Sequence, residues 1–182
     1  MTPRYYMGID PGLDGAIALY QMAQDHITMG AHSRTPAELK VFDLPTLTVT
    51  KNKKNYRVLD MDALRMWLDL HAPDVIHALI EKPHAMPKQG IASAFSFGFT
   101  CGVVEMAVAS AQIPRRTIDP AVWKRSMGLS ANKDETRRKA SEIFPQFARY
   151  FTKDGKRGNV DLLAGRAEAA LLAFLMSKLM TV

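Results

Sequence analysis

Residues 7–20, MGIDPGLDGAIALY, decide the fold that we expect of this 182-residue chain. An apolar run ends at Asp10, a Pro-Gly turn follows, and a second apolar run begins after Asp14 and Gly15. Two apolar runs joined by turn residues predict a β-hairpin, with strands over residues 5–9 and 16–20. An Asp before Pro-Gly is often turn chemistry alone. A carboxylate that ends a buried strand is also a candidate for a functional site.

The rest of the chain alternates between extended and helical hydrophobic patterns. Further strands are predicted within residues 27–44 and over residues 74–81 and 115–119. Helices are predicted over residues 60–72, 91–111, 120–127 and 132–144, and from about residue 161 to the end. Residues 46–58 have no helical period and carry several lysines, so we interpret them as an exposed loop. This order predicts one α/β domain over residues 1–182, with a mixed sheet and helices on both faces.

The composition is that of a soluble globular domain, with 47% hydrophobic and 23% charged residues. A single cysteine, Cys101, excludes an internal disulfide, and the first ten residues lack a secretory signal core. We therefore expect a cytoplasmic protein of a bacterium or a phage-infected host, or an organellar one if a transit segment was removed. Residues 91–111 have the length of a membrane span, but Glu105 and several small polar residues favour a buried helix and no membrane contact.

Basic residues are concentrated in the C-terminal half of the chain. Residues 121–160 hold ten Lys and Arg against four Asp and Glu, an excess equal to the net charge of +6 of the whole chain. Such a block favours a polyanionic partner. A solvated helix face is the alternative.

Acidic residues end two predicted central strands, Asp10 on the first and Glu81 on the strand over residues 74–81. If these strands are neighbours, the two carboxylates repel each other unless a cation lies between them. Magnesium is the usual divalent ion for oxygen ligands. For Glu81, an ion pair with Lys82 or Lys88 is the ordinary alternative.

The last helix carries two further acids. Glu168 lies among Ala and Leu residues, where a carboxylate is costly unless it is paired or metal-bound. Asp161 is two helical turns earlier and so lies on roughly the same face. A helix N-cap is the alternative interpretation of Asp161.

Several stretches together resemble the RuvC-type Holliday-junction resolvases, most nearly their phage and plastid branches, within the RNase H-like superfamily. They are GIDPGLDGAIAL, ALIEKPHAMPKQG, DPAVWKRSMGLS, NKDETRRKASEIFP and GRAEAALLA. The resemblance covers nearly the whole chain in order. It implies an α/β RNase H-like fold with a five-stranded mixed sheet, a homodimer, and cleavage of two opposed strands of a four-way DNA junction.

The resemblance also assigns site residues. It implies metal-dependent phosphodiester hydrolysis with two Mg²⁺ ions per site, for which Mn²⁺ would substitute, and with Asp10, Glu81 and Glu168 as ligands. The family usually has a further acid, or a histidine, three or four residues before the Glu168 position. Here those positions are Gly165 and Ala164, so we expect Asp161 to replace it. Asp154 is a less suitable replacement.

Side chains of the basic block and of the loop after Glu81 are expected to hold DNA phosphates, which position DNA without reading its sequence. They are Lys82, Lys88, Gln89, Lys124, Arg125, Lys133, Arg137, Arg138, Lys139, Lys153, Lys156 and Arg157. Phe95, Phe97 and Phe99 alternate within the helix over residues 91–111, so at least one points away from the core. A dimer contact and plain core packing both explain these phenylalanines.

Three other functions remain open. Another RNase H-like nuclease would cut an RNA–DNA hybrid or a flap. A non-catalytic junction-binding module is favoured by the missing acid near Gly165. Actin-like ATPases share the strand, aspartate and glycine turn, but they need two domains and a longer chain.

Overall fold

The structure is a computed structural model that describes residues 4–28, 31–35, 37–84, 90–152 and 160–180, and of residues 25–28 and 31–34 the backbone. Its strands are β1 Tyr5–Asp10, β2 Ala16–Gln21, β3 Gln24–Thr28, β4 Ala31–Thr35, β5 Glu38–Asp43, β6 Thr46–Lys51, β7 Lys54–Leu59, β8 Val75–Glu81 and β9 Arg115–Ile118. Its α-helices are α1 Met61–His71, α2 Ile91–Ser110, α3 Pro120–Ser126, α4 Lys133–Ile143 and α5 Val160–Leu179. Short 3₁₀ helices cover Ala72–Asp74 and Pro145–Tyr150.

The central sheet has five strands in the order β5-β2-β1-β8-β9. Strand β2 is antiparallel to β1 and β5, whereas β8 is parallel to β1 and β9. The predicted five-stranded mixed sheet of an RNase H-like fold is therefore confirmed. Ile9 pairs with Ile80, so the residues that follow them, Asp10 and Glu81, end neighbouring parallel strands at the same edge.

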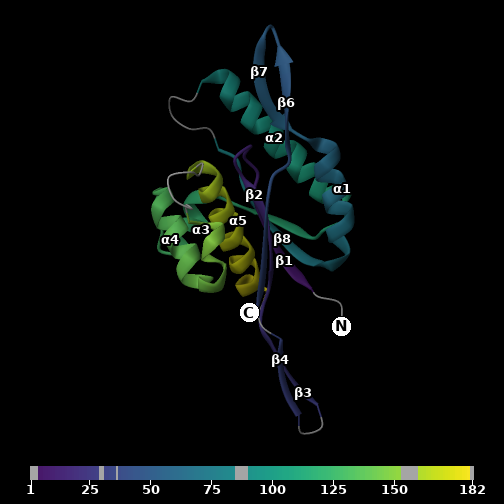
Figure 1. Cartoon of the computed structure of the whole chain (residues 1–182), viewed down its shortest axis with the longest axis vertical. Helices are drawn as coiled ribbons and strands as arrows, with labels where there is room; N and C mark the ends of the chain where they lie inside the picture. Colours follow the sequence, from purple (N-terminus) through teal and green to yellow (C-terminus); the bar gives the residue numbers. More distant parts are fainter. Residues whose placement is uncertain (1–3, 29–30, 36, 85–89, 153–159, 181–182) are drawn as a thin grey trace.

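Helices cover both faces of this sheet, as the sequence predicted (Figure 1). On one face, Met7 and Ile9 pack with Leu64 of α1 and with Val104 of α2 in one hydrophobic cluster. On the other face, a second cluster joins the sheet to α3, α4 and α5. The alternation of side chains along β1 supplies both layers, because successive residues of a strand point to opposite faces.

Helix α5 packs directly against β1 because Gly8 has no side chain. A Cβ at Gly8 would lie 2.1 Å from the carbonyl oxygen of Ala169 and 2.3 Å from the amide nitrogen of Ala173. The small residues of α5 permit the same close approach from the other side. This contact fixes the height of α5 above the sheet and brings Glu168 to the end of β1.

Two parts of the chain differ from the sequence-based expectation. Residues 46–58, interpreted as a loop, belong to a β-hairpin of β6 and β7, paired from Thr46 opposite Leu59 to Lys51 opposite Lys54. A second hairpin, β3–β4, precedes the third sheet strand, β5, so the region 27–44 holds more strands than the one predicted. The interpretation of residues 46–58 as a loop was wrong. β-Branched residues alternate there, as they do in strands, but most residues of the hairpin are exposed, so the sequence lacks the hydrophobic pattern of a buried strand. Asp60 caps the start of α1, because its side chain accepts a hydrogen bond from the Ala63 amide.

Helix α2 is less buried than expected. Its inner face contributes Thr100, Cys101, Val104 and Val108 to the core, whereas Ile91, Phe95, Phe99 and Met106 are exposed. By length and composition alone it also qualifies as a membrane span, with a mean hydropathy of 1.6 over 18 residues, of which 22% are buried. Burial of α2 is therefore confirmed only for its inner face, since its other face has no covering element in the described part of the chain.

Candidate active site

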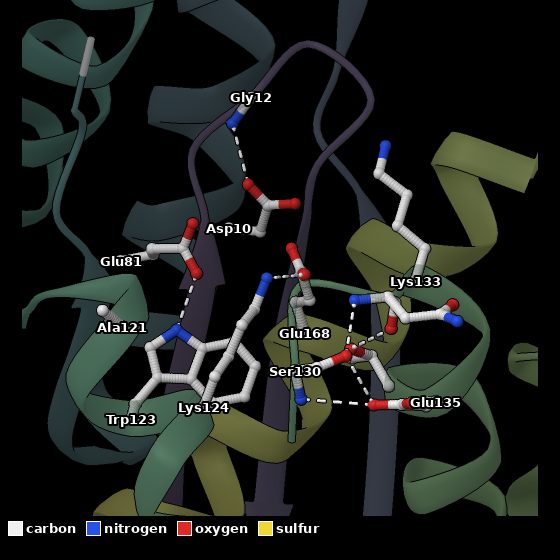
Figure 2. A network of polar contacts seen from close by, with 12 residues as sticks. Asp10, Gly12, Glu81, Ala121, Trp123, Lys124, Ser130, Lys133, Glu135 and Glu168 are labelled. Atoms are coloured by element: carbon white, nitrogen blue, oxygen red, sulfur yellow. Dashed lines mark hydrogen bonds and ion pairs between the residues drawn. The ribbon is translucent and has the colours of Figure 1, made fainter. Parts of the chain in front are cut away.

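Three carboxylates converge where the parallel strands end, and each comes from a different element (Figure 2). Asp10 is the last residue of β1, Glu81 is the last residue of β8, and Glu168 lies on the face of α5 that packs against the sheet. The Gly12 amide donates to Asp10 Oδ1 at 3.2 Å, so the turn after β1 also orients the carboxylate. Three of the four acids that the sequence analysis assigned as metal ligands are therefore neighbours; the fourth is Asp161.

Burial and mutual repulsion raise the pKa values of two of these acids. The pKa of Asp10 rises to about 8, first because its carboxyl is removed from water and then because Glu168 and Glu81 lie close by. The pKa of Glu81 rises to about 7, again through loss of hydration and then through repulsion by Glu168. Such shifts identify a site with more negative charge than its surroundings balance.

Helix α3 supplies a hydrogen-bond partner to Glu81 and another to Glu168. The indole of the fully buried Trp123 donates from Nε1 to Glu81 Oε2 at 2.7 Å. The next residue, Lys124, places its Nζ 2.7 Å from Glu168 Oε1, with both side chains largely shielded from water. Asp119 caps this short helix by accepting from the Ala121 amide. The indole and the ammonium group also lower the pKa of Glu81.

The donor chemistry of the three acids fits a hard divalent cation, although they do not form a finished coordination shell. Among the described residues, no three His, Cys, Asp or Glu side chains are grouped tightly enough to hold a metal ion. Oxygen ligands with uncompensated negative charge nevertheless suit Mg²⁺. The Lys124 ammonium is the positive charge that lies against Glu168 here, so Glu168 would exchange this partner for a metal.

Asp161 lies near these acids but in a different environment. It is inside the first turn of α5 rather than before the helix, its side chain is half exposed, and it pairs with Lys133. Together with Asp10 and Glu168 it lines a pocket of about 360 Å³. Its role as a metal ligand stays a prediction.

The missing acid at position 165 has a steric explanation. A Cβ at Gly165 would lie 2.3 Å from the carbonyl oxygen of Asp14 and 3.0 Å from Asp10 Oδ2. Helix α5 crosses the β1–β2 turn so closely here that only glycine fits. An acidic side chain at this position is incompatible with the observed packing.

A second and larger pocket, of about 830 Å³, lies on the other side of the acids. Glu81, Lys124 and Glu168 line it, together with residues 128–131 between α3 and α4. The two pockets share Phe97, Lys133 and Glu168, so they meet at the carboxylates. Phe97 therefore belongs to the candidate site, whereas Phe95 and Phe99 are exposed.

The structure separates the predicted DNA-binding residues into groups. Lys124, Arg125 and Lys133 line the pockets beside the acids, and Lys82 is exposed next to Glu81. Helix α4 carries Arg137, Arg138 and Lys139, none of which lines either pocket; Arg137 pairs with Asp134, and Arg138 lies 3.7 Å from Glu142. The remaining five lie outside the described residues, as does Asp154: Lys88, Gln89, Lys153, Lys156 and Arg157.

Sequence reasoning missed Trp123 as a residue of the site. The sequence held a signal, because Trp123 directly precedes Lys124, a predicted DNA-binding residue. A buried indole N–H also usually finds a hydrogen-bond partner. Which acceptor it meets depends on the packing of α3 against the end of β8, and no local pattern in the sequence reports that contact.

No family model matches this chain, and no curated protein matches it by sequence. Solved structures do match. The RuvC structure of Thermus thermophilus is 18% identical, with 96% of each chain covered and a TM-score of 0.52. The same values hold for T. thermophilus RuvC in complex with Holliday junction substrate. With the five-stranded sheet and its two helical layers, this similarity over almost the whole length shows that the chain has the RuvC fold, of the RNase H-like class.

Proposed function

We propose that this protein is a structure-selective endonuclease that resolves four-way DNA junctions by metal-dependent hydrolysis of phosphodiesters. The observation that carries the proposal is the convergence of Asp10, Glu81 and Glu168 at one end of a RuvC-type sheet. A similar structure is that of T. thermophilus RuvC with Holliday junction substrate, which supports branched DNA as the partner.

In this proposal Asp10, Glu81 and Glu168 would hold two Mg²⁺ or Mn²⁺ ions, with Asp161 as a further ligand. A bound divalent ion acidifies water and stabilises the anionic oxygens of a phosphodiester. Asp10 and Glu81 would first lose their protons, since a carboxyl group binds a metal ion in its deprotonated form. Trp123 orients the Glu81 carboxylate, and Lys124, once released from Glu168, is beside the DNA strand that enters the pockets.

The direct test uses a labelled four-way junction, a matched linear duplex and an RNA–DNA hybrid, each with Mg²⁺, Mn²⁺ or chelator. We expect paired symmetric nicks in the junction, which disappear with chelator. Cleavage of the hybrid instead would assign the protein to another RNase H-like activity. Tight junction binding without cleavage in any metal would identify a non-catalytic module.

We further propose that the exposed face of α2 joins two copies of the chain into a homodimer. Ile91, Phe95, Phe99 and Met106 follow one another at helical spacing and form a continuous apolar stripe. Two cuts in opposed strands of one junction require two active sites, which a dimer supplies. A membrane-spanning role fits α2 poorly, because Val104 on its inner face is fixed in the core of the fold.

The Phe95→Asp variant is expected to halve the molar mass measured by light scattering after gel filtration, because a buried unpaired carboxylate is costly at an apolar interface. Val122→Asp is the matched control, since Val122 is also exposed but lies on α3, across the sheet. A dimer that persists in Phe95→Asp would contradict this interface. Flotation of the wild-type protein with lipid vesicles would favour the membrane alternative.

The Trp123→Phe variant is expected to lower metal affinity and cleavage about tenfold, as the loss of a hydrogen bond to a metal ligand commonly does. The indole bond lowers the pKa of Glu81, so its loss raises that pKa further. The rising limb of the pH–rate profile should therefore move to higher pH. A profile with an unchanged midpoint would show that Trp123 only fills space.

A further inference from the structure

The β6–β7 hairpin projects beyond the helical layers, at the end of the molecule where β1 and β2 meet in their turn (Figure 1). All of β6 after Thr46 is exposed, and so are the first four residues of β7. The hairpin therefore contributes to the core only at its base, through Leu59. A projecting two-stranded ribbon gains little stability by itself, so packing does not explain its length.

The hairpin is strongly basic. Between Thr46 and Leu59 it carries Lys51, Lys53, Lys54 and Arg57 and no acidic residue. Lys51 and Lys54 are directly opposite each other in the register, and like charges in this position weaken strand pairing. In the part of the chain that the structure describes, none of the three lysines forms an ion pair. Their charge is thus concentrated and unbalanced at the tip.

The tip keeps a lysine at a position that favours glycine. Asn52 and Lys53 have φ angles of 52° and 62°, so both central residues of the turn are in the left-handed region. Two-residue hairpin turns of this kind are usually Asn-Gly, and a residue with a Cβ costs roughly 1–2 kcal/mol more there. Lys53 adds charge at the expense of turn stability.

One face of the hairpin is attached to the rim of the candidate active site. Arg57 Nη2 donates to Asp14 Oδ1 at 2.6 Å, and Asp14 lines the same pocket as Asp10. Thr50 donates to Asn55 at 2.8 Å on this polar face. Because side chains alternate along a strand, Lys51 and Lys54 lie on the opposite face, next to Val49 and Tyr56, which are also exposed.

We propose that the β6–β7 hairpin binds the sugar–phosphate backbone of one duplex arm of DNA, with Lys51, Lys53 and Lys54 as the phosphate contacts. The inference rests on the proposed DNA substrate and names the element that holds one arm of it. Duplex DNA presents the dense row of anions that matches a lysine pair and a charged tip. A two-stranded ribbon also has the width of a major groove. The Arg57–Asp14 contact holds the ribbon beside the carboxylates, where an arm leaves the branch point.

A second copy of this chain is the other occupant that the exposed Val49 and Tyr56 would allow. In a two-fold interface the same patch meets itself. Here that would bring the lysine pairs of two copies together without an acid to separate them. Charge therefore favours DNA over self-association at this face.

The test compares Lys51→Gln/Lys54→Gln with Arg115→Gln/Arg116→Gln, both in an Asp10→Asn background so that DNA stays uncut. Arg115 and Arg116 are equally exposed strand residues, but they lie at the start of β9, away from the carboxylate edge. Binding to a fluorescent junction and to a linear duplex is measured at several salt concentrations. We expect the slope of log affinity against log salt concentration to become shallower by about 2 in the hairpin variant. In the control variant the slope should change much less. Thermal unfolding should be unchanged in both variants.

Each outcome separates this proposal from the proposed function. An unchanged slope in the hairpin variant, with normal wild-type junction binding and cleavage, overturns the hairpin contact and leaves the resolvase intact. A reduced slope on both DNAs, together with a wild-type protein that cuts no junction, supports the hairpin and overturns the resolvase. A changed molar mass with an unchanged slope assigns the hairpin to self-association. A wild-type protein that binds no DNA overturns both.

Discussion

Asp10→Asn is expected to reduce junction cleavage on the order of 10³-fold or more and, without metal, to make the protein more stable at pH 8. The loss of cleavage follows from the proposed metal dependence, because an amide is a much weaker ligand than a carboxylate for a divalent cation. The gain in stability follows from the electrostatics of the site. Asp10 is removed from water and faces Glu168 and Glu81, and its pKa rises to about 8.

The sign of the pH dependence follows from proton binding. The folded protein holds a proton on Asp10 up to about pH 8, whereas the unfolded chain loses it near the ordinary aspartate pKa of 3.8. Between these values the folded state binds more protons, so the free energy of unfolding falls as pH rises. Glu81, with a pKa of about 7, acts in the same direction. Asparagine does not titrate, so Asp10→Asn removes the larger part of the decrease in the free energy of unfolding with rising pH.

Denaturant unfolding in chelator at pH 5 and pH 8 measures the effect. The wild-type protein should lose stability over this range, and Asp10→Asn should exceed it by on the order of 2 kcal/mol at pH 8. Mg²⁺ should then raise the melting temperature of the wild type more than that of the variant. Asp69→Asn is the control, because Asp69 is an exposed carboxylate on α1. Equal pH dependence in wild type and Asp10→Asn would show that Asp10 is not desolvated as described.

Gly8→Ala is expected to lower the free energy of unfolding by about 3 kcal/mol, the upper end of the usual cost of overpacking. The added Cβ would meet backbone atoms of Ala169 and Ala173 at 2.1 and 2.3 Å, and backbone of a packed helix cannot rotate away. Helix α5 must therefore move off β1. Because α5 carries Glu168, junction cleavage should fall at least about tenfold even where the variant is folded, as small displacements of catalytic groups do.

Gly12→Ala is the matched control for stability. Its Cβ would lie 3.5 Å from Asp10 Oδ1, which is ordinary van der Waals contact. Urea unfolding of the two variants, followed by circular dichroism, makes the comparison. If both unfold at the same urea concentration, the close contact between α5 and β1 is not as tight as described.

The sequence predicted the parts of the site that depend on local pattern. Asp10 and Glu81 end apolar runs of strand length, and parallel pairing then places them at one edge. The pairing of Trp123 with Glu81 could not be predicted in this way, because 42 residues separate the two and only the packed fold joins them. The reason for glycine at position 165 likewise appears only when α5 is seen against the β1–β2 turn.

The burial of two elements was difficult to predict, for opposite physical reasons. Helix α2 is apolar around most of its circumference, which normally indicates burial on all sides, yet Phe95 and Met106 are exposed. The β6–β7 hairpin has polar residues and lysines where buried strands have apolar ones, so its alternation gave no amphipathic signal.

Two of the three carboxylates of the candidate site are held by the same short helix, α3. It has seven residues, and its consecutive side chains Trp123 and Lys124 hold two different carboxylates, Glu81 and Glu168. Its start is fixed by the Asp119 side chain. A small rotation of this helix of about two turns therefore disturbs both acids at once, whereas supports from two separate elements would fail independently. Tolerance to substitution should consequently be low at the capping residue Asp119, where α3 begins.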